Sequence, residues 1–188
     1  LTFDQDDVAE RGVRLQMNPP IRYTEDKVTL WKRLKDGTID CIATDHAPHT
    51  LEAKALGFPK SPAGMPGVET ALPMMLTHAM DGMCSVSDVV RWMCAGPAKV
   101  YGMENKGSLI EGFDGDLTLV DLETRRVITD DDVWTRVGWT PYAGMELTGL
   151  PMWTIVDGIP VHKRTPGGSF RGEAIGAPGC AGRALRFS

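Results

Sequence analysis

The residues of this chain best suited to chemistry lie together in the run Thr44-Asp45-His46-Ala47-Pro48-His49. A carboxylate can ligate a metal ion and can exchange a proton with a reacting group. The imidazoles beside it can donate or accept hydrogen bonds, and the proline turns the chain out of a regular element. Asp45 is therefore the first candidate for a metal ligand and for a general acid or base.

Each of these side chains also has a plain structural interpretation. Asp45 could cap the turn that follows it by accepting hydrogen bonds from its own backbone. His46 could pack at the rim of the fold, and His49 could be an ordinary surface residue of a polar loop. The spacing alone leaves both interpretations open.

Two apolar segments are expected to position these residues. The apolar stretch 39–43 indicates a short buried strand over 39–44, directly before Asp45. Residues 12–18 alternate and end at Asn18 before two prolines. Between them a helix is predicted from an N-cap at Thr24 to the residues before Gly37. Strand, helix and strand form a parallel crossover unit, which places Asn18 and Asp45 at equivalent strand ends. An amide there offers a donor and an acceptor to a polar ligand, although Asn before proline is also common.

The rest of the chain divides into a long loop, helices and short strands. The Pro/Gly-rich loop 45–69 is longer than most connections, and its small residues Ala63 and Gly64 would let backbone groups approach a ligand. A flexible connector would have the same composition. Helices are predicted over 69–80 and 87–101, the second starting from Ser85 or Ser87. Strands are predicted at 117–120 and 126–129, with a hairpin over 153–162 that turns at Asp157-Gly158.

Composition places limits on the function. The chain has 188 residues, 42% of them hydrophobic and 24% charged, with a net charge of −5, so the basic footprint of a nucleic-acid-binding protein is missing. No apolar run approaches the length of about 18 residues that predicts a membrane span. The scattered cysteines favour a reducing, cytoplasmic setting. The chain begins at Leu1 and is short for a complete barrel of roughly 250 residues, so we expect part of a longer protein.

Four runs together resemble dihydroorotases of the amidohydrolase superfamily, in the class related to the multifunctional-complex type. They are Met17-Asn18-Pro19-Pro20-Ile21-Arg22, the run from Asp36 to His49, Gly67-Val68-Glu69-Thr70, and the run from Gly107 to Leu117. The last is similar to the segment with which the superfamily returns to its small β domain. The resemblance covers almost the whole chain and weakens only near its carboxyl end.

The resemblance implies an α/β fold, namely the last strands and helices of a metal-dependent (β/α)8 TIM barrel plus a small accessory β domain. On this basis residues 1–104 belong to the barrel, 105–165 form the β module and 166–188 are an extended tail. The implied reaction is the reversible cyclisation of N-carbamoyl-L-aspartate to L-dihydroorotate in pyrimidine (UMP) synthesis. The implied cofactor is zinc, with one or two ions in each complete active site.

The resemblance also assigns roles to particular residues. Asp45 matches the carboxylate after the last barrel strand, which ligates zinc and shuttles a proton to and from the substrate's ring nitrogen. Asn18 and His49 match positions that hold the substrate, and Ala63 and Gly64 match a loop pair whose backbone contacts it. The family's other metal ligands have no counterpart here, and a catalytic zinc needs about three protein ligands. We therefore expect catalysis only within a longer chain.

Two alternatives to dihydroorotase remain. A sister cyclic amidase, a dihydropyrimidinase or an allantoinase, would share the Asp-His pair, whereas Asn18 and His49 favour a dicarboxylate-like substrate and hence dihydroorotase. The second alternative is a non-catalytic, dihydroorotase-like scaffold subunit. The partners expected are the small-molecule substrate and either a second copy of the chain or an aspartate carbamoyltransferase, with no nucleic acid and no membrane.

Overall fold

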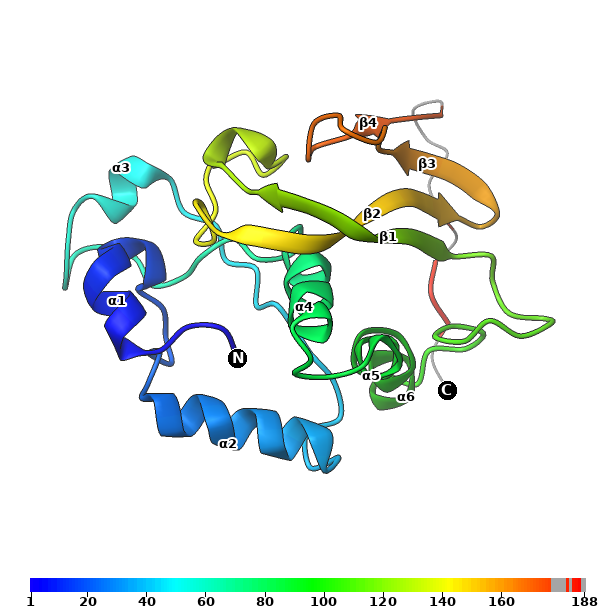
Figure 1. Ribbon diagram of the computed structural model, residues 1–188, viewed down its shortest axis with the longest axis horizontal. Coiled ribbons are helices and arrows are strands. Elements are labelled where there is room, and N and C mark those ends of the chain that lie inside the picture. The colour runs from blue at the N-terminus through cyan, green and yellow to red at the C-terminus, as the bar shows by residue number, and fades with distance from the viewer. Residues whose placement is uncertain (177–181, 183, 187–188) are drawn as a thin grey trace. The chain divides into compact units, whose positions relative to one another are not determined.

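The computed structural model describes residues 1–176, 182 and 184–186 of the chain (Figure 1). These residues form two compact units, each assembled from segments that are distant in sequence. The first unit comprises Leu1–Ile39, Thr44–Ala71 and Ile128–Met145, and the second comprises Asp40–Ala43, Leu72–Val127 and Glu146–Ser188. Cys180 and part of the predicted tail lie outside the described residues.

The helices of the first unit begin at local capping signals. Asp4 caps the first of them, and hydrogen bonds from Lys27 (2.8 Å) and Thr24 (2.9 Å) hold the pKa of its carboxyl at about 2. Because a depressed pKa favours the ionised form, this carboxylate also suits the positive end of the helix. The helical elements are α1 (Gln5–Arg11), η1 (Gly12–Leu15), α2 (Thr24–Lys35), α3 (Leu51–Lys54) and η3 (Asp130–Asp132).

Helix α2 confirms the predicted helix. Its apolar positions Trp31 and Leu34 are buried, whereas Val28 is exposed. The predicted cap shifts by one residue, because Thr24 is already helical and Asp26 accepts a hydrogen bond from the backbone N–H of Tyr23 (3.2 Å). Gly37, with φ +81°, follows the helix as predicted.

The prediction of a strand over 12–18 is wrong. Residues Gly12–Leu15 form a 3-10 turn, which the N–H of Gln16 closes by donating to the carbonyl of Val13 (3.2 Å). Alternation of side chains cannot make a strand without a partner for its backbone groups. Here the backbone groups form hydrogen bonds within the segment itself, so the alternating side chains belong to a helical turn.

The second predicted strand, over 39–44, is also absent from the structure. The backbone N–H of Ile42 donates to the carbonyl of Trp92 (3.0 Å), which belongs to a helix and offers no ladder. A buried parallel strand exists only when neighbouring strands flank it, and none pairs with 39–44 in the part of the chain that the structure describes. The parallel crossover unit is accordingly not seen.

The helices of the second unit form most of its core. Helix α4 buries six of its ten residues, including Met74, Met75 and Leu76. Ser85 caps the next helix, as predicted, with its hydroxyl accepting from the N–H of Asp88 (3.1 Å). The elements are α4 (Ala71–Met80), α5 (Val86–Val90), η2 (Arg91–Ala95, a π turn) and α6 (Gly96–Val100). No helix among the described residues has both the length and the apolar character needed to cross a membrane.

One antiparallel sheet follows in the order β1-β2-β3-β4 (Figure 1). The predicted hairpin is confirmed, since β2 and β3 are joined by Asp157 (φ +51°) and Gly158 (φ +77°), the signs that a type I′ turn needs. The strand predicted at 117–120 and the first two residues of the strand predicted at 126–129 lie in one strand, which ends at Val127. The strands are β1 (Leu117–Val127), β2 (Glu146–Val156), β3 (Ile159–Lys163) and β4 (Glu173–Ala174).

Helix α4 packs against β2. A Cβ atom on Gly149 would lie 2.8 Å from the Cβ of Leu76, so the absence of a side chain allows close approach. The Thr77 hydroxyl accepts from the N–H of Thr148 (2.9 Å) and lies 2.8 Å from the carbonyl of Pro73. A helix packed on a sheet confirms the prediction that the fold mixes α-helices and β-strands.

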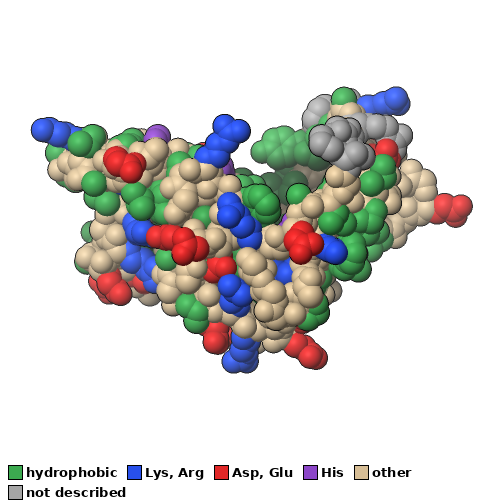
Figure 2. Space-filling model, turned by 90° about the horizontal axis from the view of Figure 1, so that it is seen from above, with side chains coloured by type: hydrophobic (Ala, Val, Ile, Leu, Met, Phe, Trp, Pro, Cys, Tyr) green, Lys and Arg blue, Asp and Glu red, His purple; other side chains and the backbone are tan. Residues whose placement is uncertain are grey.

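Charges of both signs share the surface. Figure 2 shows Lys and Arg side chains beside Asp and Glu side chains on the face seen from above. The i,i+3 pair Arg91–Asp88 joins opposite charges at the surface. A mixed surface produces only a weak long-range field.

Candidate active site

The carboxylate of Asp45 is exposed and free to react. Asp45 has a φ of +43°, which short polar side chains tolerate better than most. Across the described residues its carboxylate makes no hydrogen bond and no ion pair, so it does not cap the turn that follows. The structure therefore leaves this group available as an acid, a base or a ligand.

His46 holds the next stretch of the loop. Its Nδ1 accepts hydrogen bonds from the backbone N–H groups of Gly67 (3.1 Å) and Val68 (3.3 Å). A ring nitrogen that accepts cannot carry the proton, so the neutral ring is protonated on Nε2. His46 thus fixes the loop backbone at Gly67 and Val68.

His49 and the pair Ala63-Gly64 lie together. The His49 Nε2 is 3.1 Å from the carbonyl oxygen of Ala63. Gly64 is buried and has a φ of +136°, and a Cβ there would lie 2.7 Å from the carbonyl oxygen of Ala47 and 3.2 Å from Cδ2 of His49. Only glycine fits this approach.

Asn18 is exposed, and the backbone just before it joins the same cluster. The N–H of Gly64 donates to the carbonyl of Gln16 (3.0 Å), and the Gln16 side chain donates to the carbonyl of Ser61 (2.9 Å). The structure thus brings the segments of all five predicted site residues into the first unit. The assignment of these residues to a substrate stays a prediction.

Sequence reasoning missed Lys54, which lies at the centre of this cluster. Its side chain is 1% exposed, and its ammonium donates to the carbonyls of Gln16 (2.9 Å), Pro62 (3.0 Å) and Gly64 (2.9 Å). Burial lowers the pKa of this ammonium. Nothing in the sequence singles it out from the other lysines and arginines, which number 20 with it.

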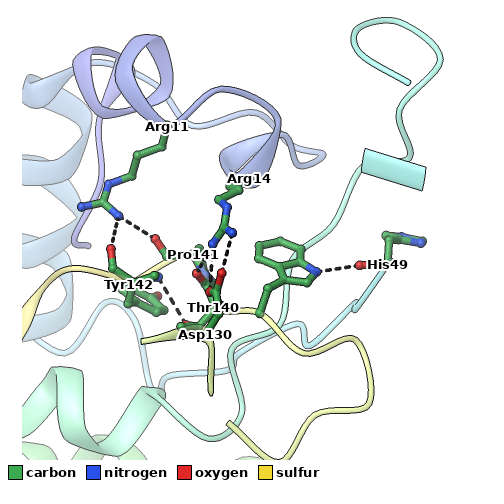
Figure 3. A network of polar contacts seen from close by, with 9 residues as sticks. Arg11, Arg14, His49, Asp130, Thr140, Pro141 and Tyr142 are labelled. Carbon is green, nitrogen blue, oxygen red and sulfur yellow. Dashed lines mark hydrogen bonds and ion pairs between the residues drawn. The ribbon is translucent and has the colours of Figure 1, made fainter. Parts of the chain in front are cut away.

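A second network, which sequence reasoning also missed, contacts the backbone of His49 (Figure 3). Arg14 forms a bidentate pair with Asp130, at 2.9 and 2.6 Å, and this pair lowers the pKa of the Asp130 carboxyl. The Arg14 guanidinium also lies 5.6 Å from the ring centre of Trp139, whose indole N–H donates to the backbone carbonyl of His49 (2.7 Å). The segment around residues 130–140 thereby fixes the backbone that carries His49.

Glu69 anchors the same segment through its backbone. Its carboxylate accepts from the N–H groups of Trp134 (2.6 Å) and Thr135 (2.7 Å). A small cavity lies here with space of about 10 Å³, enough for about one water molecule. His46, Pro66, Gly67, Glu69, Thr70, Val133, Thr135, Trp139 and Thr140 line it.

The residues present do not by themselves fit a zinc ion. Within residues 1–176, 182 and 184–186 no three His, Cys, Asp or Glu side chains gather where they could hold a metal. Asp45 can offer one carboxylate, whereas a catalytic zinc takes about three protein ligands.

Comparison with known proteins gives relatives of two kinds. The sequence profile of the amidohydrolase family matches residues 10–159. A dihydroorotase from Halobacterium salinarum is 41% identical over 175 residues, which are 93% of this chain and 41% of that protein. One from Pyrococcus furiosus is 39% identical over 167 residues, which are 88% and 39%. The solved structure of an L-hydantoinase (dihydropyrimidinase) from Arthrobacter aurescens matches with a TM-score of 0.84 and 34% identity, over 93% of this chain and 38% of that one.

The matched portion includes the whole candidate site. Asn18, Asp45, His49, Ala63 and Gly64 all lie within residues 10–159. The chain spans 41% and 39% of the lengths of the two dihydroorotases, so most of each relative has no counterpart in these residues.

Proposed function

Because the chain belongs to the amidohydrolase family, we propose that it is part of a dihydroorotase, which interconverts N-carbamoyl-L-aspartate and L-dihydroorotate. The observation that carries the proposal is the cluster itself. The carboxylate of Asp45 is free, and it belongs to the first unit. In the same unit a backbone hydrogen bond connects the segment before Asn18 to the turn at Ala63-Gly64. The identity of about 40% with proteins named dihydroorotase supports the choice of substrate.

In this proposal Asp45 moves the proton of the reaction. Hydrolysis of dihydroorotate adds water to the ring amide carbonyl and breaks the C–N bond, and the departing nitrogen takes up a proton. Asp45 donates that proton, and in the direction of synthesis it removes the proton from the attacking nitrogen, while water is the leaving group. Asn18 and His49 hold the substrate, and the backbone of Ala63 and Gly64 contacts it.

The proposal extends to the complete protein, by which we mean the product of the whole reading frame that encodes these residues. There zinc would be ligated by Asp45 and by further residues outside this chain, because one carboxylate is too few. The barrel portion at 1–104 and the tail at 166–188 are part of the proposal. The antiparallel sheet from β1 to β3 supports a β module over 105–165. A cytoplasmic location and an oligomeric or carbamoyltransferase partner remain predictions.

A related cyclic amidase is the second candidate. The similarity to an L-hydantoinase (dihydropyrimidinase) structure favours it, since opening a cyclic amide needs the same proton transfer to nitrogen. The substrates differ in one useful respect, because dihydroorotate carries a carboxylate that dihydrouracil lacks. Polar groups at Asn18 and His49 are expected to discriminate between them.

The test is a substrate panel on the complete protein with dihydroorotate, dihydrouracil, hydantoin and allantoin. We expect dihydroorotate to have the highest kcat/KM. The Asp45→Asn variant should lower kcat by about 10²–10⁴-fold, the usual contribution of a general acid or base. Asp40→Asn, an equivalent change at an exposed position, is the matched control and should leave kcat unchanged. A higher kcat/KM for dihydrouracil or hydantoin would favour the second candidate, and full activity of Asp45→Asn would refute the role of this carboxylate.

A further inference from the structure

Lys54 is buried with its charge but without an acid beside it. Its side chain is 1% exposed, and its three contacts are all backbone carbonyls. An ammonium has three N–H donors and no acceptor, so the three carbonyls satisfy it completely. No ion pair involves Lys54 among the described residues. A buried charge is costly unless its hydrogen bonds are made, so these contacts must form together.

The three carbonyls belong to the segments that carry the predicted substrate contacts. Pro62 and Gly64 flank Ala63, and Gln16 lies two residues before Asn18. One further bond joins the same segments directly, from the N–H of Gly64 to the carbonyl of Gln16 (3.0 Å). Lys54 therefore ties the turn 62–64 to residue 16.

The ammonium also gives the turn its conformation. The carbonyls of Pro62 and Gly64 point to one Nζ atom, so the carbonyl and N–H groups between them must turn elsewhere. The Ala63 carbonyl meets the His49 ring (3.1 Å), and Ala63 itself is exposed. Because hydrogen bonds from a charged donor are stronger than those from a neutral one, the charge at Nζ adds to what the bulk of the side chain supplies.

We propose that Lys54 is a positioning residue for the substrate, whose ammonium holds the backbone of Ala63-Gly64 and the segment before Asn18 in one binding arrangement. The inference rests on the proposed function for the identity of the substrate, but the arrangement of the backbone can be measured without any activity. Lys54 touches no reacting atom and supplies no proton.

The first experiment follows backbone hydrogen exchange in the complete protein. Lys54→Met keeps most of the volume and removes all three donors. We expect the hydrogen-bonded amides within residues 61–66, those of Ser61 and Gly64, to exchange about ten-fold faster or more, because the turn loses its anchor. Lys60→Met is the matched control, since Lys60 lies exposed in the same loop and should change nothing. The amides of α4 should be unaffected in both variants.

The second experiment separates KM from kcat. A lost positioning contact weakens ground state and transition state alike, so Lys54→Met should raise KM about ten-fold with kcat changed less than about three-fold. Leu34→Ala, a core change in α2, controls for stability and should leave KM unchanged. Lys54→Gln, which keeps two donors on a shorter side chain, should give smaller increases and replaces Lys54→Met if that variant does not fold.

The outcomes are distinct. Unchanged exchange at 61–66 in both Lys54 variants overturns the proposal, and so does an equal rise of KM in Leu34→Ala. If the wild-type protein opens dihydrouracil or hydantoin instead of dihydroorotate, the proposed function fails. The role of Lys54 is then decided by comparing the KM of Lys54→Met and Leu34→Ala for that cyclic amide. If the protein opens no cyclic amide, the exchange measurement decides it alone.

Discussion

Gly57 and Gly64 lie in the same loop and both have a positive φ, but they differ in what a Cβ atom would meet. At Gly57 (φ +68°) nothing lies within 4 Å of that position. At Gly64 (φ +136°) the Cβ would lie 2.7 Å from the carbonyl oxygen of Ala47 and 2.9 Å from its Cβ. A pair of alanine substitutions can therefore separate backbone strain from steric overlap.

The size of each effect follows from the geometry. An L side chain in the left-handed region costs about 1–2 kcal/mol, and the reduced freedom of the unfolded chain offsets about 0.4–1 kcal/mol of it. Gly57→Ala should thus lower the free energy of unfolding by about 0–1.6 kcal/mol. Gly64→Ala adds an overlap with backbone, and overpacking costs about 1–3 kcal/mol more. Its total should be about 1–4.6 kcal/mol.

The assay is urea denaturation of the complete protein, with the free energy of unfolding obtained by linear extrapolation. Because the overlap pushes Ala47 away from Gly64, His49 should move as well, and KM should rise for Gly64→Ala only. Equal losses of stability for the two variants would show that no close contact exists at Gly64. An unchanged KM would separate this loop from the substrate.

Three further predictions concern the network around Arg14 and the metal. The pKa of Asp130 is lowered by Arg14, so the stability it contributes is present above its unfolded value near 3.8 and is lost as the pH falls through the lower folded value. Urea denaturation from about pH 6 down to about pH 2 should therefore show a larger loss for the wild type than for Arg14→Met, and parallel curves would contradict this. Trp139→Phe removes the bond to the His49 carbonyl and should cost about 0.5–1.5 kcal/mol, measured against Trp134→Phe at an exposed indole. The 188-residue chain alone should not turn over dihydroorotate with added zinc, and measurable ring opening would refute that expectation.

Local signals explain the parts of the fold that sequence reasoning found. Ser85 and Gly37 mark helix ends because capping depends on residues within one turn. The Asp157-Gly158 hairpin is local for the same reason, since its two positive φ values select these residues. Such features need no knowledge of distant contacts.

The predicted strands over 12–18 and 39–44 failed because a strand is defined by its partner. Alternating or continuous apolar residues are compatible with a strand, a helical turn or a buried extended segment. The described residues supply no ladder to either segment, and the backbone of each bonds to a turn or to a helix instead.

By itself the sequence determined helices α2, α4 and α5, the hairpin and the chemical candidates at Asp45 and His49, because residue type and short spacing decide these. Only the tertiary structure decided that Lys54 is buried among three carbonyls and that Arg14 meets Asp130. The physical reason is separation along the chain: the ion pair joins positions 116 residues apart, and burial depends on what the rest of the fold places around a side chain.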